Sequence, residues 1–198
     1  MDEAGWEALA YEQIGRIIVA WGRFDHAITA QTWKHNDPLS PWPVGPVEGT
    51  FYKRLCRWCS IQEPNCIPAS RAAFHAFRED VRTLSKFRDD LAHNTFTVAG
   101  HHDGFSVIAT RWPKTDWRDR FDRWVAKHGH MKSFKRVEPE SGATTHIHYR
   151  NRHLAELLSA IEDSRQRVGA IGEAVGRGEQ FDLPSTPLIP EGLARLSH

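Results

Sequence analysis

The sequence predicts a mainly α protein of one domain, residues 1–198, with a small α/β insertion over residues 95–150. Apolar residues recur at helical spacing in three long segments, over 4–34, 68–91 and 151–175. Short segments of β-type residues lie between the last two helical segments. With 198 residues, 40% of them hydrophobic, and eight tryptophans, the chain can form a sizeable core.

The first predicted helix, residues 4–34, has an acid on its apolar line. Asp25 extends the line formed by Ile14, Ile18, Trp21 and Ile28. Since an unpaired buried charge costs free energy, Asp25 is expected to have a partner. A Pro/Gly-rich loop over 36–50 follows, and then a short helix from Phe51 to Ile61 that Glu63-Pro64-Asn65 is expected to break.

The third predicted helix begins near Pro68, which suits a first helical turn. Arg88 falls on its apolar line, where a charge needs a reason. The other members of that line are Phe74, Phe77, Val81, Leu84 and Leu91. A basic edge on the same helix consists of Arg71, Arg78, Arg82 and Lys86.

The predicted insertion contains strands at 95–98, 105–109 and 144–149, with a turn over 101–104. A short helix capped by Thr115 or Asp116 is expected between the second and third strands. Asn151 is a candidate cap for the last long helix. Residues 176–198 are expected to form an extended C-terminal tail, in which Leu188-Ile189 and Leu193-Leu196 are the segments able to dock on a neighbour.

Arg88 and His93 form the candidate site, because they combine a permanent cation with a titratable ring. A guanidinium offers a planar fork of donors to phosphate oxygens, and an imidazole can transfer a proton near neutral pH. The spacing alone is weak, since Arg123 and His128 repeat it in a segment typical of a solvated helix face. Residues five apart on an unbroken helix lie about 140° apart. We therefore expect either that the helix ends near Leu91 or that a partner subunit completes the site.

The segment Phe87-Arg88-Asp89-Asp90-Leu91-Ala92-His93-Asn94 resembles the signature of HEPN domains, an Arg followed by a His a few residues later. HEPN domains usually have a polar residue directly after the Arg, and Asp89 takes that place. The segment from Ile14 to Asp25 also resembles the first helix of many HEPN-like proteins, which often carry an acid near the position of Asp25. The resemblance covers residues 4–96 and 151–175, and neither the insertion nor the tail.

This resemblance implies an antiparallel helical bundle that forms a homodimer and brings two Arg/His motifs into one cleft. Active members are metal-independent endoribonucleases without a cofactor, in which the 2′-hydroxyl attacks the adjacent phosphate and leaves a 2′,3′-cyclic phosphate. Arg88 would hold the phosphate and His93 would act as general acid/base. Asp89 and Asn94 would tune or position them, and Asp25 is a candidate brace for Arg88. A toxin or phage-defence effector, with an antitoxin or regulatory partner, is the implied biological role.

Three alternatives stay open. One is a catalytically inactive HEPN-like dimeric module that binds RNA, a nucleotide or a protein, and another is a purely structural helical dimer. In the third, Arg88 pairs with Asp25 or Asp89, and His93 caps a helix end, because structural ion pairs resemble functional sites.

Substrate binding is expected at basic residues near the site and in the insertion. Residues 111–136 hold nine Lys/Arg against three Asp, interleaved with aromatic residues, a pattern suited to single-stranded RNA. The alternative is an amphipathic helix that buries Trp117, Phe121 and Trp124 beneath a solvated charged face. The candidate substrate-binding residues are Arg82, Lys86, Arg111, Lys132, Lys135 and Arg136.

Other sequence features concern possible metal sites and the cellular location. Zinc ligands are one interpretation of Cys56, Cys59 and Cys66 with His75. The alternative is that the cysteines are free and buried. His146 and His148 would share one side of a strand, with His101-His102 nearby, and form a second, weaker metal candidate. We predict no metal at the Arg88/His93 site. A net charge of +1, no apolar run of membrane-spanning length and no signal peptide predict a cytoplasmic protein without a membrane partner.

Overall fold

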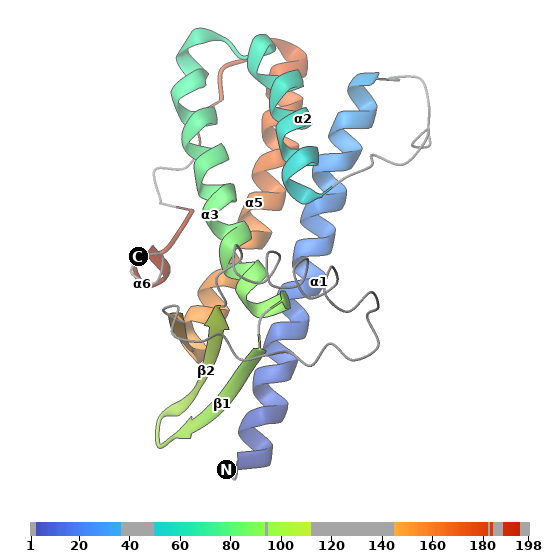
Figure 1. Cartoon of the computed structure of the whole chain (residues 1–198). Helices are drawn as coiled ribbons and strands as arrows, with labels where there is room; N and C mark the ends of the chain where they lie inside the picture. The colour runs from blue at the N-terminus through green and yellow to red at the C-terminus, as the bar shows by residue number, and fades with distance from the viewer. Residues whose placement is uncertain are drawn as a thin grey trace, which may run out of the picture.

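The computed structural model describes residues 3–36, 50–93, 95–111, 145–181, 183 and 188–194. The mainly α prediction is confirmed, and a three-stranded sheet lies at one end of a helical bundle (Figure 1). The helices are α1 (Glu3–Asn36), α2 (Phe51–Asn65), η1 (Pro68–Ser70), α3 (Arg71–His93), α5 (Asn151–Arg177) and α6 (Glu191–Ala194). The strands are β1 (Thr95–His101), β2 (Gly104–Arg111) and β3 (Thr145–Arg150).

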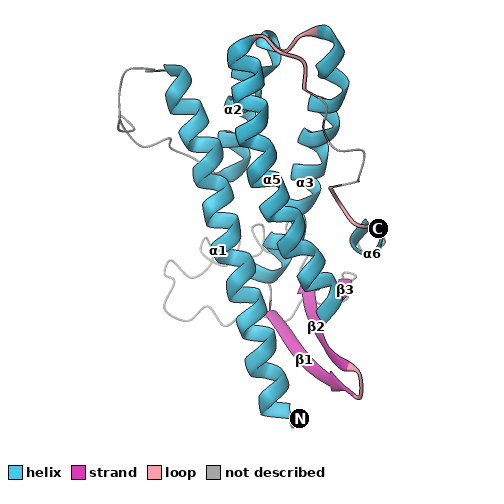
Figure 2. Ribbon diagram, turned by 180° about the vertical axis from the view of Figure 1, so that it is seen from behind, coloured by secondary structure: helices cyan, strands magenta, loops and turns pink. Residues whose placement is uncertain are grey.

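The bundle is built on α1 and α5, which form its most extensive helix–helix contact (Figure 2). Their apolar lines meet in the core, where Ile17 and Phe24 of α1 and Leu157, Ile161 and Val168 of α5 are fully buried. Burial of such side chains contributes about 2 kcal/mol each, so these two lines account for much of the stability. Within the described ranges, no helix has both the length and the apolar character needed to span a bilayer.

The sheet is antiparallel, in the order β1-β2-β3. Along β2 and β3 every second residue faces the bundle, and Phe105, Val107 and Tyr149 are buried in the same core as the helices. The described parts of the predicted insertion therefore share one core with the bundle. His101 pairs with Gly104 across a two-residue turn, and φ of +148° at position 104 explains the glycine.

Two predicted boundaries were wrong. Helix α2 does not break at Glu63-Pro64-Asn65 but continues through Asn65. Pro64 is tolerated because it lies in the last turn, where one lost backbone hydrogen bond no longer interrupts a following turn. The Asn65 amide also donates to the carbonyl oxygen of Ile61 at 2.8 Å. At the start of α5 the cap position is Arg150, and Asn151 is already helical.

Part of the C-terminal segment packs on the bundle, in contrast to the extended tail predicted for residues 176–198. Phe181, Leu188 and Leu193 are buried. The Ser70 hydroxyl donates to the carbonyl oxygen of Phe181 at 3.1 Å and accepts from its N–H at 3.0 Å. The helix predicted after Thr115 or Asp116 lies outside the described residues.

Candidate functional site

Arg88 lies on the core-facing side of α3, between Phe87 and Leu91, which are both buried. Its side chain is only 18% exposed. The guanidinium carbon lies 5.1 Å from the centre of the Trp21 ring on α1, so the cation stacks on an aromatic face. Its Nε–H is buried with no hydrogen-bond partner among the described residues. Burial of an unpaired donor costs free energy, so the placement of Arg88 lowers the stability of the fold.

The free end of the guanidinium meets His93 and Asp89. Arg88 Nη1 lies 3.2 Å from His93 Nε2 and 2.8 Å from Asp89 Oδ1. His93 Nε2 lies 3.9 Å from the same carboxylate oxygen. The His93 side chain is 69% exposed, so a ligand in solvent can reach it. The three side chains form a cluster with a partly buried cation at its base and an exposed imidazole at its outer end.

This contact removes the geometric objection raised by the five-residue spacing. Helix α3 continues to His93 and does not end near Leu91, yet both groups meet within one chain. The long arginine side chain spans the angular separation, and His93 is the last residue of the helix, where no further turn blocks it. A partner subunit is therefore not needed to bring Arg88 and His93 together.

Asp90 is a second buried charge next to the cluster that the sequence analysis did not single out. It is 4% exposed, and the Tyr149 hydroxyl donates to its Oδ2 at 3.0 Å. The Tyr149 ring also packs edge-on against Phe87. These contacts attach the last turn of α3 to β3. Asp90 follows Phe87 by three residues, so the helical periodicity that drew attention to Arg88 would also have identified it.

Asp25 has the partner that its position demanded, but that partner is Arg54 of α2. Arg54 Nε donates to Asp25 Oδ1 at 2.7 Å, and Arg54 Nη2 bonds the other carboxylate oxygen. The two side chains are 19% and 23% exposed. The contacts of Arg88 go instead to Trp21, Asp89 and His93. Asp25 thus links α1 to α2, and no direct contact makes it a brace for Arg88.

The candidate substrate-binding residues are only partly described. Arg82 is paired with Glu79 at 3.0 Å and stacks on Tyr52, so its charge is compensated. Lys86 is exposed and forms no ion pair within the described part of the chain. Arg111 ends β2, and only its backbone is described. The remaining substrate-binding candidates, Lys132, Lys135 and Arg136, lie outside the described residues. So do Asn94, predicted to tune or position Arg88 and His93, and the Arg123/His128 pair.

The cysteines are free thiols, with Cys59 and Cys66 buried and Cys56 exposed. Burial raises the pKa of the Cys59 thiol to about 12, and it raises the pKa of Cys66 as well. Buried thiols of this kind are typical of structural cysteines that pack as small apolar side chains. Within the described ranges no three His, Cys, Asp or Glu side chains converge on a point that a metal ion could occupy.

Comparison with known proteins yields no relative: no family model matches the chain, and neither do any curated proteins or solved structures. The Arg88/Asp89/His93 cluster, with its resemblance to a short HEPN motif, is the feature of the chain that points to a function.

Proposed function

We propose that the chain is a metal-independent endoribonuclease of the HEPN type, with RNA as its substrate. The observation that carries the proposal is the 3.2 Å contact between Arg88 Nη1 and the exposed ring of His93. A guanidinium stabilises the extra negative charge that develops on a phosphate during attack by the 2′-hydroxyl. An imidazole can move a proton to or from the reacting oxygens. The role of toxin or phage-defence effector, with an antitoxin as partner, follows from the family resemblance.

The reaction requires two proton transfers. The 2′-oxygen forms a bond to phosphorus and gives its proton to a base, while the bond to the 5′-oxygen breaks and that oxygen takes a proton from an acid. Arg88 would neutralise the non-bridging oxygens, His93 would be one proton carrier, and Asp89 would hold both in place. One chain contributes one His93 to this cluster, so a second copy is the simplest source of the other proton carrier.

A homodimer is supported by apolar side chains that the bundle leaves in solvent. Tyr11, Ile18 and Val19 on α1 are 56%, 38% and 55% exposed, and Tyr52 on α2 is 53% exposed. Residues 11 and 18 are two turns apart and lie on the same side of α1, and residue 19 lies about 100° around the helix from residue 18, so the three border one broad side. The same helix supplies Trp21, on which Arg88 stacks. We propose that a second copy covers this side of α1.

The test is cleavage of total RNA by the purified protein in excess EDTA. We expect products with 2′,3′-cyclic phosphate ends, and we expect His93→Gln to abolish them. His75→Gln is the matched control, because His75 is also partly exposed on α3 and pairs with a glutamate at 3.4 Å. Cleavage that EDTA stops, or that persists in His93→Gln, would contradict the proposal.

A catalytically inactive module that binds RNA, a nucleotide or a protein is the second candidate. It is favoured by the 2.8 Å contact between Arg88 and Asp89, which already neutralises the guanidinium. A cation so paired has less attraction for a phosphate. Binding of 2′-O-methyl RNA, together with no cleavage of ordinary RNA by either wild type or His93→Gln, would identify this function.

A further inference from the structure

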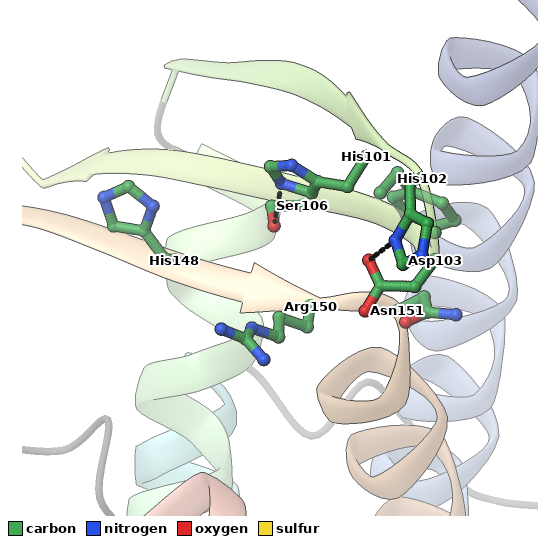
Figure 3. Close-up of a pocket in the computed structure, with 9 residues that line it drawn as sticks. His101, His102, Asp103, Ser106, His148, Arg150 and Asn151 are labelled. Atoms are coloured by element: carbon green, nitrogen blue, oxygen red, sulfur yellow. Dashed lines mark hydrogen bonds and ion pairs between the residues drawn. The ribbon is translucent and has the colours of Figure 1, made fainter.

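The outer face of the sheet carries a polar pocket that is separate from the Arg88/His93 cluster. Ser106 of β2 and Arg150 of β3 are paired in register, and His148 lies two residues before Arg150 on the same face. His101, at the end of β1, joins them from the hairpin, and Asn151 closes the other side (Figure 3). The pocket has a volume of about 620 Å³.

The lining consists mostly of hydrogen-bond donors and groups able to carry positive charge. Three of its residues are histidines, one is an arginine, and Asp103 is its one carboxylate. Asp103 lies 3.7 Å from His102, and both are strongly exposed at the tip of the hairpin. Arg150 is exposed, and no carboxylate within the described part of the chain pairs with it. A guanidinium without a carboxylate partner is available to an anion from solvent.

One side chain of the pocket is already held in place. The buried Ser106 hydroxyl lies 2.9 Å from His101 Nε2, which anchors that ring over the sheet (Figure 3). A ring anchored in this way loses less conformational entropy on binding a ligand. The other ring nitrogen of His101 comes from β1, whereas the His148 ring and the Arg150 guanidinium come from β3, so a ligand can be approached from two strands.

A metal ion is the first alternative for a group of histidines, and the geometry does not favour it. No three metal-ligating side chains converge among the described residues, and these include the histidines of this pocket. Arg150 in the lining would also repel a cation. An oxyanion has the opposite needs, because its oxygens accept from guanidinium, imidazole, amide and hydroxyl donors at once.

We propose that this pocket binds a phosphate group carried by a nucleoside, either a free nucleotide or the phosphorylated end of an oligonucleotide. Phosphate matches the donors, and the volume leaves room for an attached nucleoside, since pockets for small ligands span roughly 300–1,000 Å³. The proposal does not depend on the nuclease activity. The residues that line the pocket come from the three strands, the hairpin turn and the start of α5, and none of them belongs to the Arg88/Asp89/His93 cluster.

Isothermal titration calorimetry tests the proposal, with His93→Gln as the starting protein so that RNA cleavage does not interfere. The probes are adenosine 5′-monophosphate, adenosine, and one 2′-O-methyl oligonucleotide with and without a 5′-phosphate. We expect the two phosphorylated probes to bind more tightly than their unphosphorylated counterparts. Adding Arg150→Gln should weaken their binding by about tenfold or more, because it removes a charge-assisted hydrogen bond.

Two further variants separate the pocket from general charge effects. His148→Gln should weaken the same phosphate-dependent binding, whereas Arg177→Gln, at the other end of α5, should not. Binding of the nucleotide alone would identify the free nucleotide as ligand, and binding of the oligonucleotide alone would identify the RNA end. Equal binding with and without phosphate, equal binding by Arg150→Gln, or binding only in the presence of added ZnCl₂ would overturn the proposal.

Discussion

The Arg54–Asp25 pair and the Arg88–Asp89 pair use the same two side-chain types in different geometries. Arg54 bonds both carboxylate oxygens of Asp25 through two nitrogens, and the pair joins α1 to α2. Arg88 contacts one oxygen of its sequence neighbour through Nη1, and the same nitrogen contacts His93.

The difference separates a structural ion pair from a candidate functional one. In the Arg54–Asp25 pair, the carboxylate meets the guanidinium with both oxygens, an arrangement that adds geometric specificity between two helices. In the Arg88–Asp89 pair, the carboxylate is 40% exposed and the adjoining imidazole is 69% exposed. A phosphate oxygen could replace Asp89 there without unfolding the helix. The chemical type of a pair therefore says less about its role than what surrounds it.

The largest expected effect is a loss of cleavage when the Arg88–Asp89 pair is disrupted. We expect Arg88→Ala to lower the rate of RNA cleavage per folded molecule by at least about 100-fold, because it removes the cation proposed to bind the phosphate. Arg88→Lys should recover only part of the rate, since lysine keeps the charge but not the planar fork. Cleavage rates and circular dichroism spectra of both variants measure this. A rate equal to that of wild type in Arg88→Ala would make the pair structural.

A smaller loss of activity is expected from the exposed side of α1. Val19→Glu should convert the proposed homodimer to a monomer and lower cleavage by about tenfold or more, because a buried unpaired carboxylate opposes association. Sedimentation velocity and cleavage assays measure the two effects. Ala170→Glu, at an exposed position of α5, is the control and should change neither. A Val19→Glu variant that remains dimeric would place the interface elsewhere.

Disruption of the Arg54–Asp25 pair should lower the stability of the fold rather than the cleavage activity. Asp25→Ala leaves Arg54 without the carboxylate it bonds, which should lower the free energy of unfolding by about 2 kcal/mol. Urea denaturation measures this, and Asp163→Ala, an exposed acid on α5, is the control. The cleavage rate per folded molecule should stay unchanged. If the cleavage rate falls as far as it does in Arg88→Ala, Asp25 influences the site although it does not contact Arg88 directly.

The smallest expected effect concerns the attachment of α3 to the sheet. Tyr149→Phe removes the hydroxyl that donates to Asp90, which should cost about 1 kcal/mol and lower the melting temperature by about 3 °C. The loss should be seen in a thermal melt. Because Asp90 lies in the same turn as Arg88 and Asp89, a modest fall in cleavage should accompany it. A Tyr149→Phe protein as stable as wild type would show that the bond contributes little.

Local patterns accounted for most of the fold. Apolar residues at three- and four-residue spacing predicted α1, α3 and α5, and alternation with a turn over 101–104 predicted the hairpin. The Arg88/His93 motif was readable because both residues lie within one turn and a half of a single helix. The helix break predicted at Pro64 was wrong, because a proline disrupts the middle of a helix but is tolerated in its last turn.

Periodicity also showed that Asp25 needs a partner, because a charge on an apolar line is costly wherever the helix packs. It could not name Arg54, 29 residues away on α2, since that choice depends on how two helices rotate about each other. The bond from Tyr149 to Asp90, 59 residues apart, and the pocket shared by the strands depend on the same relative placement. Local spacing therefore specifies which side of each element is buried, whereas only the packed bundle decides which side chains meet there.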